Sequence, residues 1–508
     1  MIGARLFLRL QTVRGWRADL LALGLGAVSA AALPPIYILP ALLLAVPGLL
    51  ALIEGTRGYG GAFRRGFFFG LGHHIFGLYW ITEAIMLESA RYWWLVPLAV
   101  PALSALLALF IALPCAVAKR ARPGLRRVTA LAGAWVLFDL ARQYVGTGFP
   151  WNPWGSVWAL PGVAGDVMLQ PLAWVGTPGL TLVTVFLAGA AMLSARGAAA
   201  SAAVLAVWAG LGWVRLRQPA APAPGIDAVI VQGNVSQGQK WGRDSAIEAF
   251  DRQLQLTRDG VAQAGSHKSV VVWPETSTFF WLQSEPGARA ALADAAKPAL
   301  ASLVGGLTLD DPSKPVSMTT NAPANSLIAL GPDGDIEGIY SKWHLVPFGE
   351  YAPSWVPFAI QIVPGHLAFG TGPKTLTIPG LPAFGPLICY EAVFPAQVID
   401  EAVRPTWMVN ITNDAWFGNS TGPRQHLAAV RMRAVEEGLP VIRAANTGIS
   451  AVFDAGGHEI ARIGLGIAGE MVVPIPGPRP ATSFSRWGLV IPGVMSVFAL
   501  TLGLRRKV

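Results

Sequence analysis

The sequence predicts a multi-pass α-helical membrane protein into which a large α/β domain is inserted. Of the 508 residues, 53% are hydrophobic and only 13% are charged. The composition is too apolar for an ordinary soluble protein, and the chain is too long for one domain. Long apolar runs fill residues 1–217 and return at 488–504. The stretch 223–480 is more polar and alternates strand-like with helix-like segments, which indicates a separate α/β domain.

The apolar runs predict about eight membrane-spanning helices, seven before the polar domain and one after it. A helix needs about 20 residues to cross a bilayer. The runs that meet this need lie at about 18–33, 36–54, 62–83, 92–118, 128–145, 170–193, 197–216 and 488–504. The first run follows four arginines and ends in three alanines, as a cleavable signal peptide does. We favour an uncleaved first span, because another apolar run begins at once.

Two features of the span region have more than one interpretation. His73 and His74 lie inside the third run, and we expect interior packing or a hydrogen bond between helices there. The loop 149–154 is rich in tryptophan and proline. It is either an aromatic belt at the membrane interface or the floor of a membrane-facing active site.

The basic residues predict the orientation of the chain. The net charge of +9 gathers beside apolar runs, so it indicates membrane topology and not nucleic-acid binding. If the N-terminus is cytoplasmic, most arginines and lysines of the short loops also fall on the cytoplasmic side, as the positive-inside rule requires. Both termini are then cytoplasmic, and residues 223–480 lie outside the cytoplasm.

Short β-branched and apolar runs predict the strands of the α/β domain. They lie at 226–231, 269–273, 326–330, 387–388, 407–411, 441–442 and 449–453. Ser245 and Glu248 have the spacing of a capping box that opens a helix through Phe250, Leu254 and Val261. The domain therefore reads as one α/β unit without an internal repeat.

Three side chains with complementary chemistry stand at the ends of predicted elements. Glu275 follows the strand that ends at Trp273, Lys342 lies amid aromatic and apolar residues, and Cys389 ends a short apolar strand. Because Cys115 lies at the end of a distant apolar span, we expect Cys389 to be a free thiol. A thiolate attacks an acyl carbonyl, a carboxylate takes the thiol proton, and a lysine stabilises the oxyanion and favours the thiolate.

The motifs around these residues resemble the Glu-Lys-Cys triad of the carbon-nitrogen hydrolase (nitrilase) superfamily. They are Trp-Pro-Glu at 273–275, Tyr-Ser-Lys at 340–342 and Cys-Tyr-Glu at 389–391, followed by Asn-Asp-Ala-Trp-Phe-Gly at 413–418 and Asn-Thr-Gly-Ile-Ser at 446–450. Together with the flanking spans, the chain is similar to the bacterial apolipoprotein N-acyltransferase family. The resemblance covers nearly all of the sequence.

The resemblance implies a periplasmic, four-layer α-β-β-α nitrilase-like domain on a helix bundle in the bacterial inner membrane. It implies transfer of an acyl chain from a phospholipid to the cysteine, and then to the α-amine of the diacylglyceryl-cysteine of an apolipoprotein. Glu275 would be the general base, Lys342 the oxyanion stabiliser and Cys389 the nucleophile. A supporting role falls to Glu350, which would orient Lys342.

The same resemblance places four residues around the substrate pocket. These are Trp241, Tyr390, Glu391 and Trp416, and the backbone N–H of Tyr390 would also serve the oxyanion. The histidines show no metal-ligand spacing, so we expect no metal and no cofactor. The partners implied are a phospholipid acyl donor, a diacylated apolipoprotein acceptor and the bilayer itself, with no nucleic acid, and the enzyme is expected to be a monomer.

Several alternatives stay open at this point. Glu350 and Glu391 would also suit ordinary salt bridges with Arg424, Arg431 or Arg443. The residues 416–417 would suit a plain core. The aromatic segment 351–364 either gates lipid entry from the outer leaflet or folds into the domain core. A membrane-tethered amidase or nitrilase would use the same triad with water as the acceptor, and a transporter or binding protein would use the polar domain as a receptor.

Overall fold

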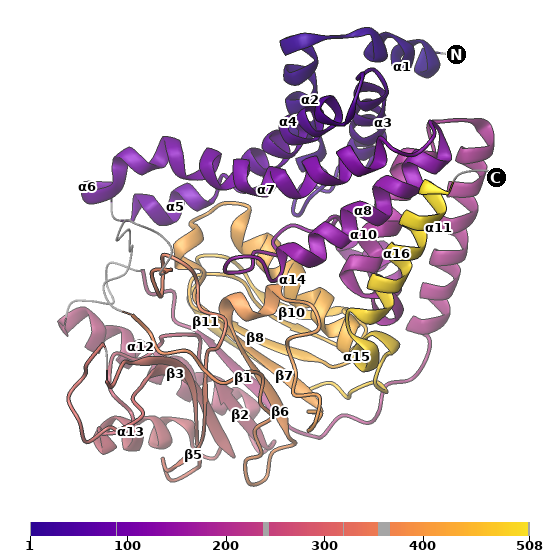
Figure 1. Ribbon diagram of the computed structural model, residues 1–508. Coiled ribbons are helices and arrows are strands. Elements are labelled where there is room, and N and C mark those ends of the chain that lie inside the picture. Colours follow the sequence, from indigo (N-terminus) through magenta and orange to yellow (C-terminus); the bar gives the residue numbers. More distant parts are fainter. Residues whose placement is uncertain (1, 88, 237–242, 319, 354–365, 506–508) are drawn as a thin grey trace. The chain divides into compact units, whose positions relative to one another are not determined.

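The computed structural model describes residues 2–87, 89–236, 243–318, 320–353 and 366–505 (Figure 1). The chain forms two compact units. One consists of Met1–Gln218 and Thr482–Val508, and the other is Pro219–Ala481. The first unit is helical, and the second is an α/β unit built on two sheets.

The helical unit contains every helix that the apolar runs predict. Its helices are α1 (Ile2–Thr12), α2 (Gly15–Ala30), α3 (Pro40–Glu54), α4 (Tyr59–Gly77), α5 (Ile81–Met86), α6 (Ser89–Tyr92), α7 (Val96–Ala118), α8 (Leu125–Arg142), α9 (Gly162–Leu169), α10 (Leu172–Ala190), α11 (Ala195–Leu216), α15 (Ser483–Trp487) and α16 (Val490–Leu504). Within the described residues, three stretches are long and apolar enough to cross a membrane: Trp93–Ala118, Leu172–Ala190 and Ala195–Leu216. The helices α3 and α16 are shorter and apolar, so the count of eight spans stays a prediction.

Glycines allow α4 to lie close to helices on two of its sides. A Cβ atom on Gly72 would overlap the Leu23 carbonyl of α2. On the other side, a Cβ on Gly70 would stand 2.8 Å from the Cα of Ala108 in α7. Small residues at such positions let helix backbones approach, which is how helices associate when no water drives their packing.

One buried histidine of this unit has hydrogen-bond partners on other segments of the unit. His73 Nδ1 lies 2.8 Å from the Ser29 hydroxyl of α2, and Trp154 Nε1 donates to His73 Nε2 at 3.3 Å. The predicted hydrogen bond between helices is therefore confirmed. Trp151 and Trp154 are buried within the unit, so the interpretation of these two rings as an interfacial belt is wrong.

The α/β unit contains two mixed sheets (Figure 1). The six-stranded sheet has the order β11-β1-β2-β3-β4-β5, and the five-stranded sheet has the order β10-β9-β8-β7-β6. The strands are β1 (Asp227–Gln232), β2 (Ser269–Val272), β3 (Ala301–Thr308), β4 (Ala324–Leu330), β5 (Ile336–Ser341), β6 (Phe384–Ile388), β7 (Trp407–Thr412), β8 (Val441–Ala445), β9 (Ser450–Phe453), β10 (Glu459–Ile463) and β11 (Gly469–Pro474). In each sheet three consecutive strands pair in parallel, β1-β2-β3 and β6-β7-β8.

The two sheets pack face to face between helical layers. Alternate residues of a strand point to opposite faces, and β1 shows the consequence: Ala228 and Ile230 join the core between the sheets, whereas Val229 and Val231 join the core under the helices. The helices α12 (Arg243–Ala264) and α13 (Pro286–Ala296) cover the six-stranded sheet, and α14 (Gly422–Glu437) covers the five-stranded sheet. The expected four-layer α-β-β-α arrangement is confirmed.

The structure also corrects the expected start of α12. The helix begins at Arg243, two residues before Ser245. The predicted capping box of Ser245 and Glu248 is therefore wrong, because both residues lie within the helix. All seven predicted strands are present, whereas β3, β5, β10 and β11 were not predicted. Two of these, β5 and β10, consist mostly of partly exposed positions and have little continuous apolar sequence.

Candidate active site

Cys389 stands where β6 gives way to a short 3₁₀ helix, Cys389–Val393. Its backbone has φ +49°, a left-handed conformation that residues other than glycine rarely adopt. Such strained residues cluster at functional sites, where the surrounding structure holds them. Two further non-glycine residues with positive φ, Thr276 and Phe348, flank the proposed carboxylates Glu275 and Glu350. This unusual backbone therefore occurs at Cys389 itself and within two residues of Glu275 and Glu350.

Glu275 follows β2 and is held almost without exposure to solvent. Pro274, which lacks an N–H, interrupts the strand pairing, and the chain then passes so close to Gly305 of β3 that a Cβ there would stand 2.6 Å from the Glu275 Cα. The Glu275 Oε1 atom accepts from Asn325 Nδ2 at 2.7 Å and from Lys342 Nζ at 3.1 Å. Its Oε2 atom accepts from the backbone N–H of Asn413 at 2.8 Å. Both carboxylate oxygens are therefore fixed.

Lys342 lies directly after β5, with its side chain only 1% exposed. Its ammonium donates to Glu275 at 3.1 Å and to Glu350 at 2.9 Å. Burial alone would lower the pKa of Lys342, but Glu275, Glu350 and Cys389 outweigh it and raise the pKa well above its ordinary value. Lys342 is therefore a fixed positive charge between two carboxylates.

Asn325 is a part of this cluster that the sequence did not reveal. Its Nδ2 group donates to Glu275 at 2.7 Å and to Glu350 at 2.9 Å. Glu350 in turn accepts from the Val346 N–H at 2.7 Å. An asparagine in an ordinary strand such as β4 carries no sequence signal of this role, because the bridge exists only once β4, β5 and the following loop meet. Glu350 contacts Lys342 directly, as its predicted supporting role requires, and among the described residues its ion pair is with this lysine and not with an arginine.

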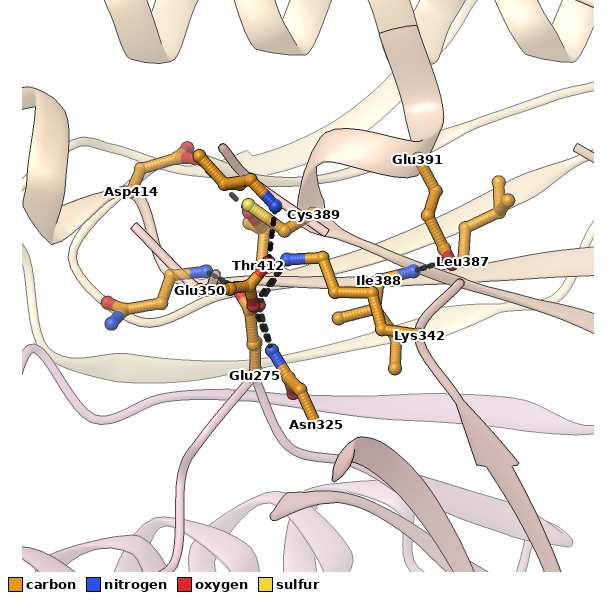
Figure 2. Close-up of polar contacts among 12 residues, drawn as sticks. Glu275, Asn325, Lys342, Glu350, Leu387, Ile388, Cys389, Glu391, Thr412 and Asp414 are labelled. Carbon is orange, nitrogen blue, oxygen red and sulfur yellow. Dashed lines mark hydrogen bonds and ion pairs between the residues drawn. The ribbon is translucent and has the colours of Figure 1, made fainter. Parts of the chain in front are cut away.

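The Cys389 thiol lies beside the same cluster, and Thr412 of β7 lies next to it (Figure 2). Burial raises the pKa of the Cys389 thiol and Glu275 raises it further, whereas Lys342 and a hydrogen bond with Thr412 lower it; the net direction is upward. Lys342 thus favours the thiolate, as expected, but burial outweighs it. Burial therefore favours the protonated thiol, so a base has to remove its proton when it attacks.

Glu391 connects the cysteine turn to the lysine segment. Its Oε2 atom accepts from the Ile388 N–H at 2.7 Å, and its Oε1 atom accepts from the Trp343 N–H at 2.8 Å and from the Tyr340 hydroxyl at 2.9 Å. These bonds tie the residue before Cys389 to the residue after Lys342. The alternative that Glu391 pairs with an arginine is wrong. Burial raises the pKa of Glu391 to about 7 against the opposing effect of these donors.

The other predicted pocket residues have different surroundings. Tyr390 is buried, and its ring meets Phe394 edge-on with the centroids 5.1 Å apart. Trp416 is partly exposed, so the alternative that it belongs to a plain core is wrong. Trp241 and most of the segment 351–364 lie outside the described residues. The gating role of that segment therefore stays a prediction.

A second buried polar cluster lies behind Cys389 and was not predicted. Asp414, His426 and Arg443 have fully buried side chains. Arg443 Nη2 lies 2.7 Å from Asp414 Oδ2, and His426 Nδ1 lies 2.9 Å from Asp414 Oδ1. His426 Nε2 lies 2.9 Å from the carbonyl oxygen of Cys389. The motif at 413–418 contains the aspartate, but no spacing in the sequence links it to the histidine of α14.

The fold and the buried carboxylate-lysine-thiol cluster define a carbon-nitrogen hydrolase domain. In agreement, residues 230–475 match the family model described as "Carbon-nitrogen hydrolase". Residues 25–190 match "Apolipoprotein N-acyltransferase N-terminal domain". The apolipoprotein N-acyltransferase of Rhodopseudomonas palustris is 35% identical over 97% of this chain and 96% of its own length. That of Brucella melitensis is 35% identical over 94% and 93%. The chain belongs to the apolipoprotein N-acyltransferase family.

Among solved structures, an amidase from Nesterenkonia sp. covers 51% of this chain and 93% of its own, with 16% identity and a TM-score of 0.37. This likeness is too low to add to the family assignment.

Proposed function

We propose that this chain is a membrane acyltransferase that acylates the N-terminal cysteine of apolipoproteins. The acyl chain comes from a phospholipid and passes through a thioester on Cys389. The observation that carries the proposal is the buried cluster of Glu275, Lys342 and Glu350 beside the Cys389 thiol (Figure 2), in a chain similar along its length to curated apolipoprotein N-acyltransferases.

In the first half-reaction the Glu275 carboxylate takes the proton of the Cys389 thiol. The sulfur attacks the carbonyl carbon of the sn-1 ester, and the developing oxyanion is stabilised by the Lys342 ammonium and the Tyr390 backbone N–H. The tetrahedral intermediate collapses with cleavage of the ester C–O bond. The proton on Glu275 passes to the leaving alkoxide, so a lysophospholipid departs and an acyl thioester remains.

In the second half-reaction the neutral α-amine of the acceptor attacks the thioester carbonyl. Glu275 takes a proton from the attacking nitrogen, and the same oxyanion donors act again. Cleavage of the C–S bond releases the N-acylated acceptor, and the departing sulfur regains the proton. Glu350 and Asn325 hold Lys342 and Glu275 in place throughout, while Tyr390, Glu391, Trp416 and Trp241 form the substrate pocket.

The membrane arrangement is part of the proposal. The region 1–217 supplies seven spans and 488–504 the eighth, both termini are cytoplasmic, and the domain 223–480 is periplasmic. The apolar stretches of the helical unit support this arrangement, as does the distribution of basic residues along the sequence. The enzyme acts as a monomer in the bacterial inner membrane, where the donor lipid and the lipid-anchored acceptor both arrive from the bilayer plane.

Mass spectrometry of the Cys389 peptide tests the function. Purified protein incubated with phospholipid should gain the mass of one acyl chain on that peptide, and a diacylated N-terminal lipopeptide should then discharge it onto its amine. Release of free fatty acid without acylation of the amine would mean that the chain is a hydrolase with water as acceptor. The absence of any adduct on Cys389 would overturn the thioester mechanism.

A further inference from the structure

The buried histidine of α14 faces an oxygen from each of its two ring nitrogens. His426 Nε2 lies 2.9 Å from the carbonyl oxygen of Cys389, and Nδ1 lies 2.9 Å from Asp414 Oδ1. A carbonyl oxygen only accepts hydrogen bonds, and so does an ionised carboxylate. Both ring nitrogens therefore have to donate, and this requires the doubly protonated imidazolium.

The charge of Asp414 is secured by its other partners. Burial alone would raise the pKa of Asp414, but Arg443 and His426 outweigh it and hold the pKa below its ordinary value. Arg443 Nη2 lies 2.7 Å from Oδ2, and the Thr412 hydroxyl donates to Oδ1 at 3.2 Å. A guanidinium only donates, and it lies at ion-pair distance from Oδ2, so the carboxylate is ionised.

One contact of His426 favours a neutral imidazole, and it is longer than the contact with the carboxylate. Arg443 Nη2 lies 3.4 Å from His426 Nδ1 and would donate to it if that nitrogen carried no proton. The lone pair of the nitrogen would then face the Asp414 carboxylate at 2.9 Å. The shorter approach to the anion outweighs the longer approach to the cation, because Coulomb energy falls with distance.

We propose that His426 is a positioning residue for acyl transfer, acting as an imidazolium that fixes and polarises the peptide between Cys389 and Tyr390. This proposal rests on the proposed function, in which the N–H of that peptide donates to the oxyanion. The peptide C=O and N–H share one resonance system. A charge-assisted hydrogen bond on the oxygen draws electron density from the nitrogen, which makes the N–H a stronger donor. The same bond holds Cys389 at φ +49°.

The test distinguishes an effect on oxyanion stabilisation from an effect on the reactivity of the thiol. Acylation of Cys389 by phospholipid creates an oxyanion, whereas alkylation of the same sulfur by iodoacetamide is a direct displacement that creates none. The rates of both reactions are measured on the full chain, wild type and His426→Gln. Glutamine keeps a neutral donor and loses the charge, so acylation should fall by about 10-fold while alkylation stays within about 3-fold.

The chain offers a matched control, since His267 Nδ1 lies 3.0 Å from Asp227 Oδ2 with its side chain 73% exposed. His267→Gln should change neither rate. If His426→Gln slows acylation and alkylation equally, His426 only shapes the thiol turn, and the proposal is overturned; an unchanged acylation rate also overturns it. If the wild type gains no acyl group but is alkylated normally, the proposed function fails instead.

A measurement that needs no folded His426 variant probes the charge directly. ¹⁵N spectra of histidine-labelled His267→Gln protein are recorded at pH 7.5, where exposed imidazoles are mostly neutral. The His267→Gln substitution removes the exposed pair of His267 and Asp227 from these spectra. A resonance pair from a ring with both nitrogens protonated is expected. If every histidine is neutral in those spectra, the imidazolium and the proposal with it are wrong.

Discussion

The two cysteines of this chain are both buried and both free, yet their surroundings differ in kind. Cys115 lies in α7 among apolar side chains and is packed against α4, where a Cβ on Gly66 would stand 2.7 Å from its sulfur. Cys389 stands in a left-handed turn beside Lys342, Glu275 and Thr412. Burial therefore does not distinguish a packing thiol from a reactive one. The fixed charges and hydrogen-bond donors within reach of the sulfur do.

The largest effect should come from replacing each cysteine in turn by serine. Cys389→Ser should lower the rate of acyl-enzyme formation by at least about 10³-fold. A serine hydroxyl is a much weaker acid than a thiol, so Glu275 cannot readily deprotonate it. Cys115→Ser should leave that rate within about 2-fold. Intact-mass spectrometry after incubation with phospholipid measures both. An acyl adduct that disappears in the Cys115 variant and persists in the Cys389 variant would reverse the assignment of the two thiols.

Removing the cation beside Cys389 should have the next largest effect. Lys342→Met keeps the length of the side chain but leaves Glu275 and Glu350 without their shared partner and the oxyanion without its charge. Acylation should slow by about 10²- to 10³-fold. Lys374→Met, at an exposed position of the same unit, is the control and should match the wild type. A Lys342 variant that acylates within 5-fold of the wild type would show that the lysine does not stabilise the oxyanion.

On the Cys115 side, the expected effect is on packing alone. A Cβ at Gly66 would also stand 2.8 Å from the Cα of Ala112, so Gly66→Ala should destabilise the helical unit by about 1–3 kcal/mol through overpacking. The thermal midpoint in detergent measures this loss. Gly60→Ala, in the same helix with nothing within 4 Å of the new Cβ, should not lower it. Equal midpoints for the two variants would mean that α4 and α7 have room to separate.

The last effect depends on pH and concerns Glu391, which ties the Cys389 turn to the lysine segment. Its folded pKa of about 7 lies above the ordinary 4.5, so the native state binds an extra proton between these values. The stability contribution is fully present below about pH 4.5 and is lost as pH rises towards 7, by at most about 1.4 kcal/mol per pH unit. Glu391→Gln should lack this pH dependence, so the thermal midpoint of the wild type should fall relative to that of the variant as the pH rises. A wild-type and a variant curve that run parallel from pH 5 to 8 would contradict it.

The elements that the sequence predicts well are those with a strong local pattern. The apolar runs give the longer apolar helices of the helical unit but not α1, α9 or α15, and the β-branched runs give seven strands, including β1 and β7. In contrast, β5 is half-exposed and mostly lacks such a run. The start of α12 was misplaced because Ser245 and Glu248 have the spacing of a cap, although the helix has already begun at Arg243.

The site shows the same division between local pattern and long-range contact. Glu275, Lys342 and Cys389 stand at predicted element ends, and the order of their motifs carries the family resemblance. Their catalytic roles remain predictions. Asn325 and His426 have no such signal, because each matters through a partner far along the chain: Asn325 bridges Glu275 and Glu350, and His426 reaches the Cys389 carbonyl across 37 positions.

The sequence by itself determined that this is a membrane chain with an inserted α/β domain, and it predicted the three kinds of side chain that we propose for its chemistry. Periodicity, composition and residue type are properties of neighbouring residues, so they survive without a fold. Only the tertiary structure decided that the Cys389 thiol is buried beside fixed charges, that Glu391 links that turn to the lysine, and that a buried histidine contacts the Cys389 carbonyl. Burial and hydrogen bonding depend on which distant segments meet, and no local pattern records this.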